Sequence, residues 1–260
     1  MFLQTEKLRP DFPHAQVQTM VIPAAGYGTR MRELTGGGSK ELLPVRGRPA
    51  LGYALQEAVA AGIRRVGVII RKGKEEIIEA VRSDPCLVSI AKNLDIDFFY
   101  QTRANGEAGA IWAAAQWIGD ASFAVYYPDN VIADQPSVLA ELVARQSDLQ
   151  KDLVLLTRHL DHVQAPPCGL EAVSNNLYCL NTLEKPLDFP YGLRPTGIYI
   201  ATSYFLRACG DLMKTSNSGE IKDRDVRYRM YIVGYKTYGV DLDADVLDIG
   251  NYEGYSAADN

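Results

Sequence analysis

The sequence predicts an α/β fold in which a mostly parallel sheet is flanked by helices. Short apolar runs at residues 18–24 and 65–70 alternate with segments of helical periodicity at residues 49–61 and 74–82. Parallel strands that are buried on both faces have such continuous apolar runs, and each parallel connection needs a crossover that is usually a helix. The alternation therefore indicates a doubly covered sheet.

Composition and charge limit the kind of protein. The 260 residues contain 47% hydrophobic and 23% charged side chains, which is typical of a globular enzyme with one substantial core. The formal net charge of −5 is opposite in sign to that of a general nucleic-acid binder. We therefore expect one domain at residues 17–260, after a polar N-terminal tail at residues 1–16, and no nucleic-acid partner.

Zinc-binding and membrane-spanning patterns are not found in the sequence. The four cysteines have no paired metal-ligand spacing and there are three histidines, so a zinc site is not expected. We find no secretory leader and no apolar run of membrane-spanning length. These observations predict a cytoplasmic protein with reduced thiols and no membrane partner.

The pattern of elements changes in the second half of the chain. The first half continues with two strands and two helices, at residues 96–100, 122–127, 108–117 and 137–145. Trp112 and Trp117 fall on one of these helices and are expected to pack in the core. The β-rich segments at residues 153–157, 170–183 and 196–201 then predict added antiparallel strands that carry specificity.

A glycine-rich segment, Ala24-Ala-Gly-Tyr-Gly-Thr-Arg30, follows the first strand, at the sheet edge where ligands bind in open α/β folds. Glycines let the backbone approach a polyanion, unpaired amides can point at its oxygens, and Arg30 adds a bidentate donor. An ordinary strand-to-helix loop is the alternative interpretation. Two known phosphate motifs are excluded, because Met31 replaces the third glycine of the dinucleotide fingerprint and no Gly-Lys-Ser/Thr follows.

Three charged residues in other predicted loops could carry chemistry. Lys40 follows the glycine run at residues 36–38, which could close over a polyphosphate; a solvated lysine in a disordered loop is the alternative. Asp129 and Asp248 each follow a short apolar strand, where two carboxylates could hold Mg²⁺ between phosphate oxygens. Either aspartate alone is more often a turn former, and sequence spacing does not show that they pair.

Further polar residues suit a nucleotide and a sugar phosphate. Gln101, at the end of a strand, could read a base edge through a bidentate amide contact, and Gly106 would let a flat base stack on the backbone. In Glu184-Lys185 the lysine could bind a second phosphate while the glutamate accepts hydrogen bonds from sugar hydroxyls. A surface ion pair beside Pro186 is the alternative.

Together these residues resemble the bacterial sugar-1-phosphate nucleotidyltransferases, especially the glucose-1-phosphate uridylyltransferases. The resemblance runs from about residue 20 to residue 258 and implies a Rossmann-like nucleotidyltransferase fold. It rests on motifs that follow in the family's order, namely residues 21–31, Lys40-Glu-Leu-Leu-Pro44, Asp129-Asn130, Glu184-Lys185-Pro186, Thr196-Gly197 and Asp248-Ile-Gly250.

The resemblance implies a nucleoside triphosphate, with UTP favoured, and a sugar-1-phosphate as substrates, with Mg²⁺ as cofactor. The sugar-1-phosphate would attack the α-phosphorus in line, pyrophosphate would leave, and no covalent enzyme intermediate would form. Arg30 and Lys40 would be the catalytic groups on the phosphates, and Asp129 and Asp248 the metal ligands. The implied nucleotide-binding residues are Ala24, Ala25, Gly26, Gly28, Thr29, Gln101 and Gly106. The implied sugar-phosphate residues are Glu184, Lys185 and Gly197.

Four features depart from the family pattern. Glu33 stands where a proline is usual, and the glycine run at residues 36–38 makes the connection to Lys40 more flexible. Glu107 replaces the common leucine beside the base, and residues 222–229 are unusually charged. Glu107 leaves the choice of base open, and the sequence as a whole leaves the sugar and any homo-oligomer open.

Two other functions are compatible with the sequence. Phosphocholine cytidylyltransferases share the glycine loop and the lysine, but Glu184-Lys185-Pro186 favours a sugar phosphate over a quaternary ammonium group. A nucleotide-binding regulatory homologue without turnover is the other alternative. It is disfavoured because Lys40, Asp129 and Asp248 are all retained.

Overall fold

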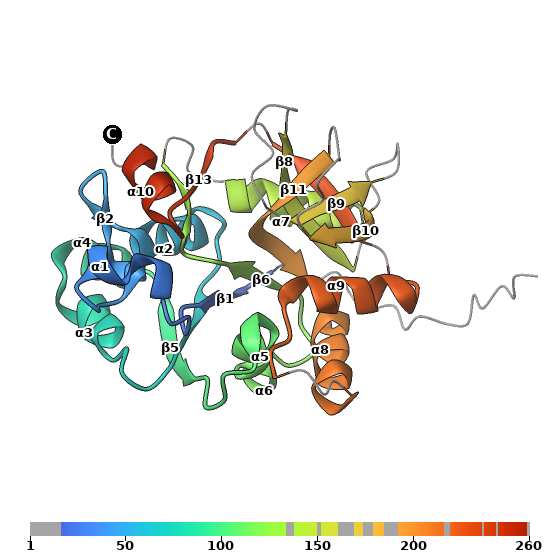
Figure 1. Ribbon diagram of the computed structural model, residues 1–260, viewed down its shortest axis with the longest axis horizontal. Helices are drawn as coiled ribbons and strands as arrows, with labels where there is room; N and C mark the ends of the chain where they lie inside the picture. Colours follow the sequence, from blue (N-terminus) through green and yellow to red (C-terminus); the bar gives the residue numbers. More distant parts are fainter. Residues whose placement is uncertain are drawn as a thin grey trace, which may run out of the picture.

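A nine-stranded sheet forms the centre of the described molecule (Figure 1). The computed structural model describes residues 17–133, 138–149, 152–160, 169–173, 179–184, 192–215, 219–235, 237–242 and 244–258; the predicted tail at residues 1–16 lies outside them. Strand β1 (Thr19–Pro23) lies between β4 (Arg65–Ile70) and β6 (Phe123–Tyr126), and β5 (Asp95–Tyr100) borders β4. All these pairings are parallel, so the predicted parallel half of the sheet is confirmed.

The other strands of this sheet are mostly antiparallel. β11 (Gly192–Ala201) runs antiparallel to β6, to β8 (Leu153–Leu160) and to β9 (Gly169–Val173). β9 in turn pairs antiparallel with β10 (Cys179–Glu184), whereas β12 (Thr237–Asp241) is parallel to β8. The predicted change from parallel strands to added antiparallel strands is therefore confirmed.

Helices cover both faces of the sheet (Figure 1). Met20 and Ile22 of β1 belong to one buried cluster and Val21 belongs to the other, which is why the centre of β1 is a continuous apolar run. Side chains of the first cluster come from α2 (Ala50–Ala60), α3 (Glu76–Ser83), α4 (Pro85–Ala91) and α7 (Val138–Leu149). Those of the second come from α5 (Gly106–Trp112), α6 (Ala115–Ile118), α8 (Ser203–Thr215) and α9 (Asp223–Ile232).

The prediction of one helix at residues 108–117 is wrong, because the structure divides it into α5 and α6. The N–H of Ala113 is shared between the carbonyls of Gly109 and Ala110, at 3.2 and 3.1 Å, so the last turn of α5 tightens and the helix ends. Trp112 is 40% exposed, which corrects its expected place in the core. It instead covers Gly210 of α8, where an added Cβ would lie 2.8 Å from the indole ring.

A small two-stranded sheet joins distant parts of the chain. β7 (Asn130–Ile132), just after β6, pairs antiparallel with β13 (Val246–Asp248) near the C-terminus. Helix α10 (Tyr252–Ala258) follows and packs beside the hairpin of β2 (Pro44–Val45) and β3 (Arg48–Pro49), where the Tyr255 hydroxyl donates to the Pro44 carbonyl at 2.7 Å. The C-terminal segment therefore returns to the chain that follows Lys40.

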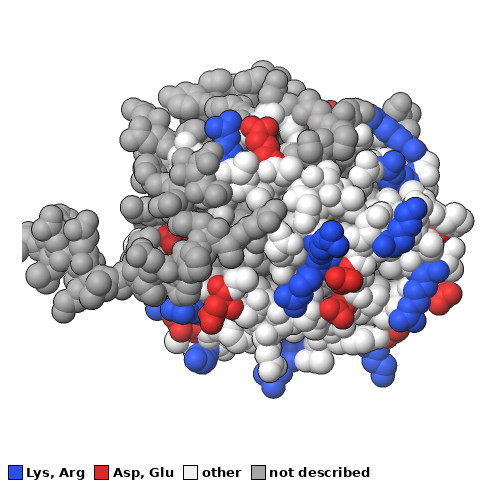
Figure 2. All heavy atoms as spheres, turned by 180° about the vertical axis from the view of Figure 1, so that it is seen from behind, with Lys and Arg blue, Asp and Glu red and all other residues white. Residues whose placement is uncertain are grey.

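The described residues contain no membrane-spanning helix, and one face of them carries mixed charge. None of their helices is both long enough and apolar enough to cross a membrane. On the described part of the face in Figure 2, basic and acidic side chains lie interspersed among other residues.

Candidate active site

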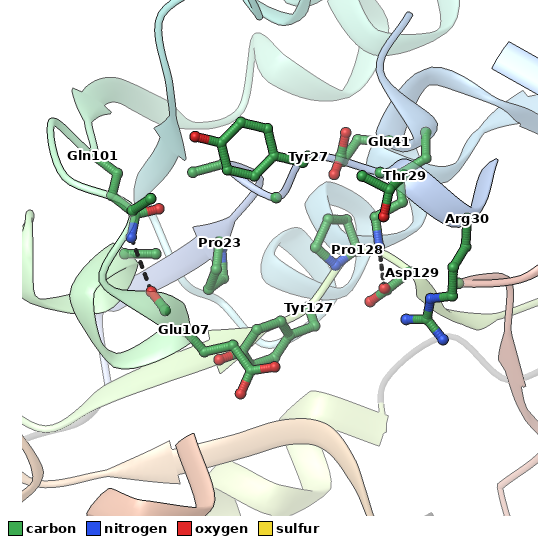
Figure 3. Close-up of a pocket in the computed structure, with 18 of the residues that line it drawn as sticks. Pro23, Tyr27, Thr29, Arg30, Glu41, Gln101, Glu107, Tyr127, Pro128 and Asp129 are labelled. Atoms are coloured by element: carbon green, nitrogen blue, oxygen red, sulfur yellow. Dashed lines mark hydrogen bonds and ion pairs between the residues drawn. The ribbon is translucent and has the colours of Figure 1, made fainter. Parts of the chain in front are cut away.

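A cavity of about 400 Å³ opens at the carboxyl ends of β1, β5 and β6 (Figure 3). This is the sheet edge at which the sequence predicts a ligand. Nine of the predicted site residues line the cavity, namely Ala25, Gly26, Gly28, Thr29, Arg30, Lys40, Gln101, Gly106 and Asp129. Ala24 is fully buried behind the loop.

A tight turn sets the direction of Arg30. Gly28 has a φ of 61°, a left-handed conformation that costs glycine little. It accepts a hydrogen bond from the N–H of Met31 at 2.9 Å, which closes the 3-10 turn η1 (Thr29–Met31). Because Met31 is buried, the turn is anchored and exposed Arg30 borders the cavity.

The backbone of the glycine loop offers hydrogen-bond donors. The N–H groups of Ala25, Gly26 and Tyr27 have no hydrogen-bond partner in the described structure, and all three residues line the cavity. Gly26 and Tyr27 are exposed, so this part of the loop is open to solvent and to a ligand. A ligand with several acceptor oxygens, such as a phosphate chain, would provide partners for the N–H groups.

Lys40 reaches the cavity from the 3-10 turn η2 (Lys40–Leu42). The preceding Ser39 donates from its hydroxyl to Glu76 Oε1 at 2.7 Å, which ties the turn to the first residue of α3. The ammonium group of Lys40 donates to Asp129 Oδ2. In the described structure the predicted phosphate-binding lysine is therefore paired with a predicted metal ligand.

The glycine run before Lys40 is a structured helix end, so the alternative of a disordered loop does not hold. α1 (Arg32–Thr35) ends at Gly36, which has a φ of 60°. The N–H of Gly37 donates to the carbonyl of Arg32 at 3.1 Å. Two left-handed glycines with such back-bonding are a common way to end a helix.

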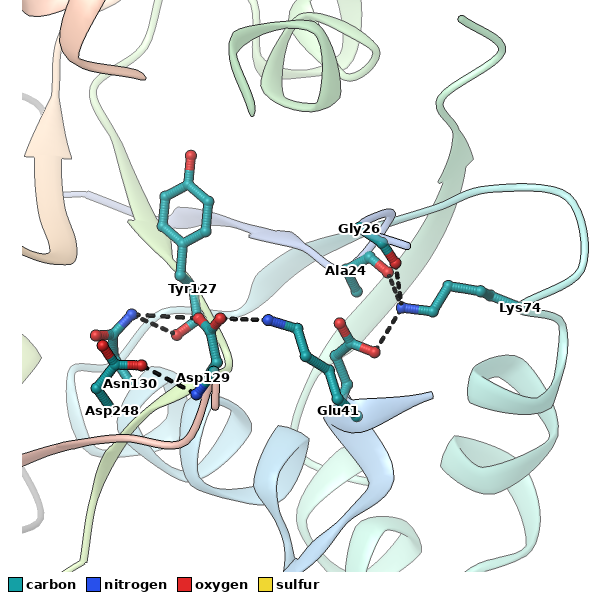
Figure 4. A network of polar contacts seen from close by, with 10 residues as sticks. Ala24, Gly26, Glu41, Lys74, Tyr127, Asp129, Asn130 and Asp248 are labelled. Carbon is teal, nitrogen blue, oxygen red and sulfur yellow. Dashed lines mark hydrogen bonds and ion pairs between the residues drawn. The ribbon is translucent and has the colours of Figure 1, made fainter. Parts of the chain in front are cut away.

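Lys74 binds the back of the glycine loop (Figure 4). Its Nζ donates to the carbonyls of Ala24 and Gly26, at 2.8 and 3.1 Å, and to Glu41 Oε2 at 2.6 Å. The Lys74 and Glu41 side chains are 5% and 1% exposed. Because Glu41 follows Lys40 directly, this buried ion pair connects the glycine loop to the turn that carries Lys40.

The pKa values of the two lysines are shifted in opposite directions. Burial disfavours the ammonium form of Lys40, but the carboxylates of Asp129 and Glu41 outweigh burial and raise its pKa. Burial lowers the pKa of Lys74, although the Glu41 carboxylate opposes that shift. The two carboxylates thus offset the burial of Lys40, which stays positively charged at neutral pH, as an anion-binding group must be.

Strand pairing brings Asp129 and Asp248 together. Asp129 immediately precedes β7, and the antiparallel register places Asp248 opposite Asn130. A methyl group built on Gly250 would lie 3.0 Å from Asp248 Oδ1, 3.3 Å from Asp129 Oδ2 and 4.0 Å from Arg30 Nη2. The two carboxylates and the guanidinium therefore surround one point at the edge of the cavity.

This carboxylate pair fits a Mg²⁺ ion that is also coordinated by a substrate. Mg²⁺ in nucleotide sites typically takes one or two carboxylates, phosphate oxygens and water. Among the described residues, no group of three or more His, Cys, Asp or Glu side chains is arranged to hold a metal. The remaining ligands would therefore come from phosphate and water.

Gln101 lies at the end of the cavity opposite Arg30 (Figure 3), and Gly106, which it contacts, also lines the cavity. The side-chain amide of Gln101 donates to Asn105 Oδ1 and to the Gly106 carbonyl, both at 2.9 Å. Both hydrogens of the side-chain amide are thus engaged. Gln101 therefore has only its acceptor Oε1 left for a ligand, and no free donor. Gly106 has a φ of 83°, and a Cβ there would lie 2.4 Å from the carbonyl oxygen of Ile221.

The comparisons with known proteins agree with this geometry. The family described as "Nucleotidyl transferase" matches residues 19–260. The chain belongs to the nucleotidyl transferase family.

Curated relatives and solved structures are similar over most of the chain. UTP–glucose-1-phosphate uridylyltransferase of Pseudomonas aeruginosa is 27% identical, over 94% of this chain and 95% of that protein. UTP–glucose-1-phosphate uridylyltransferase 1 of Staphylococcus saprophyticus is 29% identical, over 74% and 72%. A UDP-glucose pyrophosphorylase complexed with UDP-glucose gives a TM-score of 0.79 at 24% identity, over 94% and 97%. The predicted nucleotidyltransferase fold is therefore confirmed.

Two departures from the nucleotidyl transferase pattern contact each other. Glu107, in place of the common leucine, accepts a hydrogen bond from the N–H of Asp223 at 3.0 Å. Asp223 begins the unusually charged helix α9, and its carboxylate binds the Tyr199 hydroxyl at 2.9 Å and Arg227 Nη1 at 2.8 Å. Asp223 and Arg227 are buried, so part of the charge on α9 serves to attach this helix to β11.

The residues predicted for the sugar phosphate are only partly described. Gly197 has a φ of 74°, and a Cβ there would lie 3.1 Å from Cδ2 of Tyr127, which lines the cavity. Glu184 ends strand β10, with its side chain outside the described part of the structure. Lys185 lies outside the described residues.

No sequence motif identifies the buried pair of Lys74 and Glu41. One clue is that Lys74 follows β4 by four residues, which places it at the carboxyl edge of the sheet. Another is that Glu41 is next to Lys40. Neither clue indicates that a lysine would bind the carbonyls of the glycine loop.

We expect Glu41→Gln to lower the free energy of unfolding by about 3 kcal/mol, because it leaves the buried Lys74 ammonium without a counter-charge. Urea denaturation measures this change. The control is Glu141→Gln, which removes an exposed pair with Arg145 on α7 and should cost less than about 0.5 kcal/mol. Equal effects of the two substitutions would contradict the role given to the buried pair.

Proposed function

We propose that this chain joins a nucleoside triphosphate to a hexose 1-phosphate and releases pyrophosphate. The observation that carries the proposal is the convergence of Arg30, Lys40, Asp129 and Asp248 beside a loop with unpartnered N–H groups. Cations and oriented amides suit a polyphosphate, and a pair of carboxylates suits its metal ion. We propose residues 17–260 as one catalytic domain.

The base end of the cavity favours uracil. Gln101 offers its Oε1 acceptor, because its amide hydrogens are engaged elsewhere. Gly106, the first residue of α5, has an N–H without a partner among the described residues. Uracil and thymine both have the complementary groups, since N3–H is a donor and the flanking carbonyls are acceptors, whereas N3 of cytosine is an acceptor. The uridylyltransferase names of the curated relatives favour uracil of these two bases.

The chain's own residues would act by positioning and charge neutralisation. An oxygen of the sugar-1-phosphate forms the new bond to the α-phosphorus as the bond to the pyrophosphate oxygen breaks, and the electron pair leaves with pyrophosphate. Arg30 and Lys40 neutralise charge on the triphosphate. Asp129 and Asp248 would hold Mg²⁺, which when bound supplies further neutralisation at phosphate oxygens.

The sugar phosphate would lie on the side of Gly197. The proposed contacts are Gly197 together with Glu184 and Lys185. Glucose 1-phosphate, or a related hexose 1-phosphate, is favoured because the relatives are named for glucose 1-phosphate.

The proposal predicts a defined pair of substrates. Purified protein and Mg²⁺ are mixed with one nucleoside triphosphate at a time, chosen from UTP, dTTP, CTP, ATP and GTP. Each mixture receives one second substrate, which is either a hexose 1-phosphate from a panel or phosphocholine. Pyrophosphate release and product mass are then measured. We expect UTP with a hexose 1-phosphate to give the fastest release and a UDP-sugar as product. CTP with phosphocholine as the preferred pair, or triphosphate binding without turnover, would contradict the proposal.

Substitutions at the phosphate and metal positions should act on turnover. We expect Lys40→Ala and Asp248→Asn each to lower kcat at least about a hundredfold, because each removes a group that neutralises developing charge. The control is Asp245→Asn, which changes an exposed aspartate just before β13 and should leave kcat within about twofold. Steady-state kinetics over a Mg²⁺ titration gives these values. Full activity of Asp248→Asn would exclude that residue from the metal site.

A further inference from the structure

We propose that Lys74 is a positioning residue that aims the N–H groups of the glycine loop at the triphosphate and holds the Lys40 turn beside them. The inference rests on the proposed function, because it gives Lys74 a task in the same site. Lys74 is buried and is not part of the cavity lining. Its effect on a substrate must therefore pass through the groups that it binds.

All three hydrogens of the Lys74 ammonium are used within the protein. An ammonium group has three donors, and Nζ has three acceptors, at the carbonyls of Ala24 and Gly26 and at Glu41 Oε2. Glu41 also supplies the opposite charge. No donor is left for a phosphate, which distinguishes Lys74 from Arg30 and Lys40 at the cavity.

The two carbonyl contacts fix the direction of two peptide groups. In a planar trans peptide, the C=O of one residue and the N–H of the next point in opposite directions. The carbonyls of Ala24 and Gly26 point at Lys74, so the N–H groups of Ala25 and Tyr27 point away from it. Ala25 and Tyr27 line the cavity, and their N–H groups have no partner in the described structure. Lys74 thereby presents two amides to the oxygens of an anion.

Glu41 extends this control to Lys40. The two residues are adjacent on η2, and Glu41 is 2% exposed, so the direction of the turn depends on the pairing of Glu41 with Lys74. The amide donors and the catalytic ammonium consequently share one anchor. Displacements of about 1 Å in substrate-positioning groups can change rates about a hundredfold.

The test is Lys74→Met, which removes the ammonium group while keeping a long side chain. We expect the KM for UTP to rise about tenfold, with the KM for the hexose 1-phosphate unchanged within about twofold. Lys74→Arg restores donors to the loop carbonyls and should return the KM for UTP to within about threefold of the wild-type value. Lys72→Met, at an exposed lysine of the same segment, is the control and should leave both KM values unchanged.

A purely structural role predicts a different result. Fewer folded molecules would lower kcat and leave both KM values unchanged, and that outcome would overturn the proposal. If Lys74→Met does not fold, UTP binding to Glu41→Gln is measured by calorimetry. An affinity loss of about tenfold supports the proposal, and unchanged affinity overturns it.

Failure of the proposed function is a separate outcome. Wild-type protein without turnover would contradict nucleotidyl transfer, and UTP titration of wild type and Lys74→Met would still test the positioning role. Turnover by the wild type with an unchanged KM for UTP in Lys74→Met would overturn the positioning role alone.

Discussion

The buried ion pair of Lys74 and Glu41 is the constraint on which the geometry of the site depends. One ammonium group holds the carbonyls of Ala24 and Gly26 and the carboxylate of Glu41, and so connects the glycine loop, η2 and the start of α3. Burial of an unpaired charge is costly, whereas a paired charge with all its hydrogen bonds made is tolerated. Lys74, which sets the geometry, is therefore buried, whereas Arg30 and Lys40, the cations that would contact substrate, border the cavity.

A second support comes from the third buried cluster. It contains Val45 of β2, Val131 of β7, Ile249 after β13 and Ala258 of α10. The N–H of Ile249 also donates to the carbonyl of Asp129 at 2.8 Å. The chain after Lys40 and the chain that brings Asp248 to Asp129 thus share one small core. Packing there fixes the distance between Lys40 and the carboxylate pair.

The parallel strands and the glycine loop could be predicted because their sequence signals are local. The centre of β1, at residues 20–22, is a continuous apolar run, since both faces are covered, and the left-handed turn at Gly28 favours glycine. The structured end of α1 was less evident, because three consecutive glycines suggest flexibility until their hydrogen bonds are known. Trp112 was misplaced because helical periodicity does not show that a glycine on another helix will accommodate its ring.

The remaining features depend on contacts between distant segments. Spacing along the chain does not show that Asp248 lies opposite Asn130, because that register is set by strand pairing. Nor does it show that the amide hydrogens of Gln101 are engaged, or that Glu107 binds the start of α9. The bond between Glu107 and Asp223 joins segments that are distant in the sequence. The local sequence around each side chain is equally compatible with other hydrogen-bond partners.

The most direct test of this account is a crystal structure with Mn²⁺ and a non-hydrolysable UTP analogue, with data collected at the manganese absorption edge. The account predicts an anomalous peak between the carboxylates of Asp129 and Asp248. It also predicts phosphate oxygens within hydrogen-bond distance of the N–H groups of Ala25 and Tyr27. A peak away from both aspartates, or a triphosphate bound outside this cavity, would contradict it.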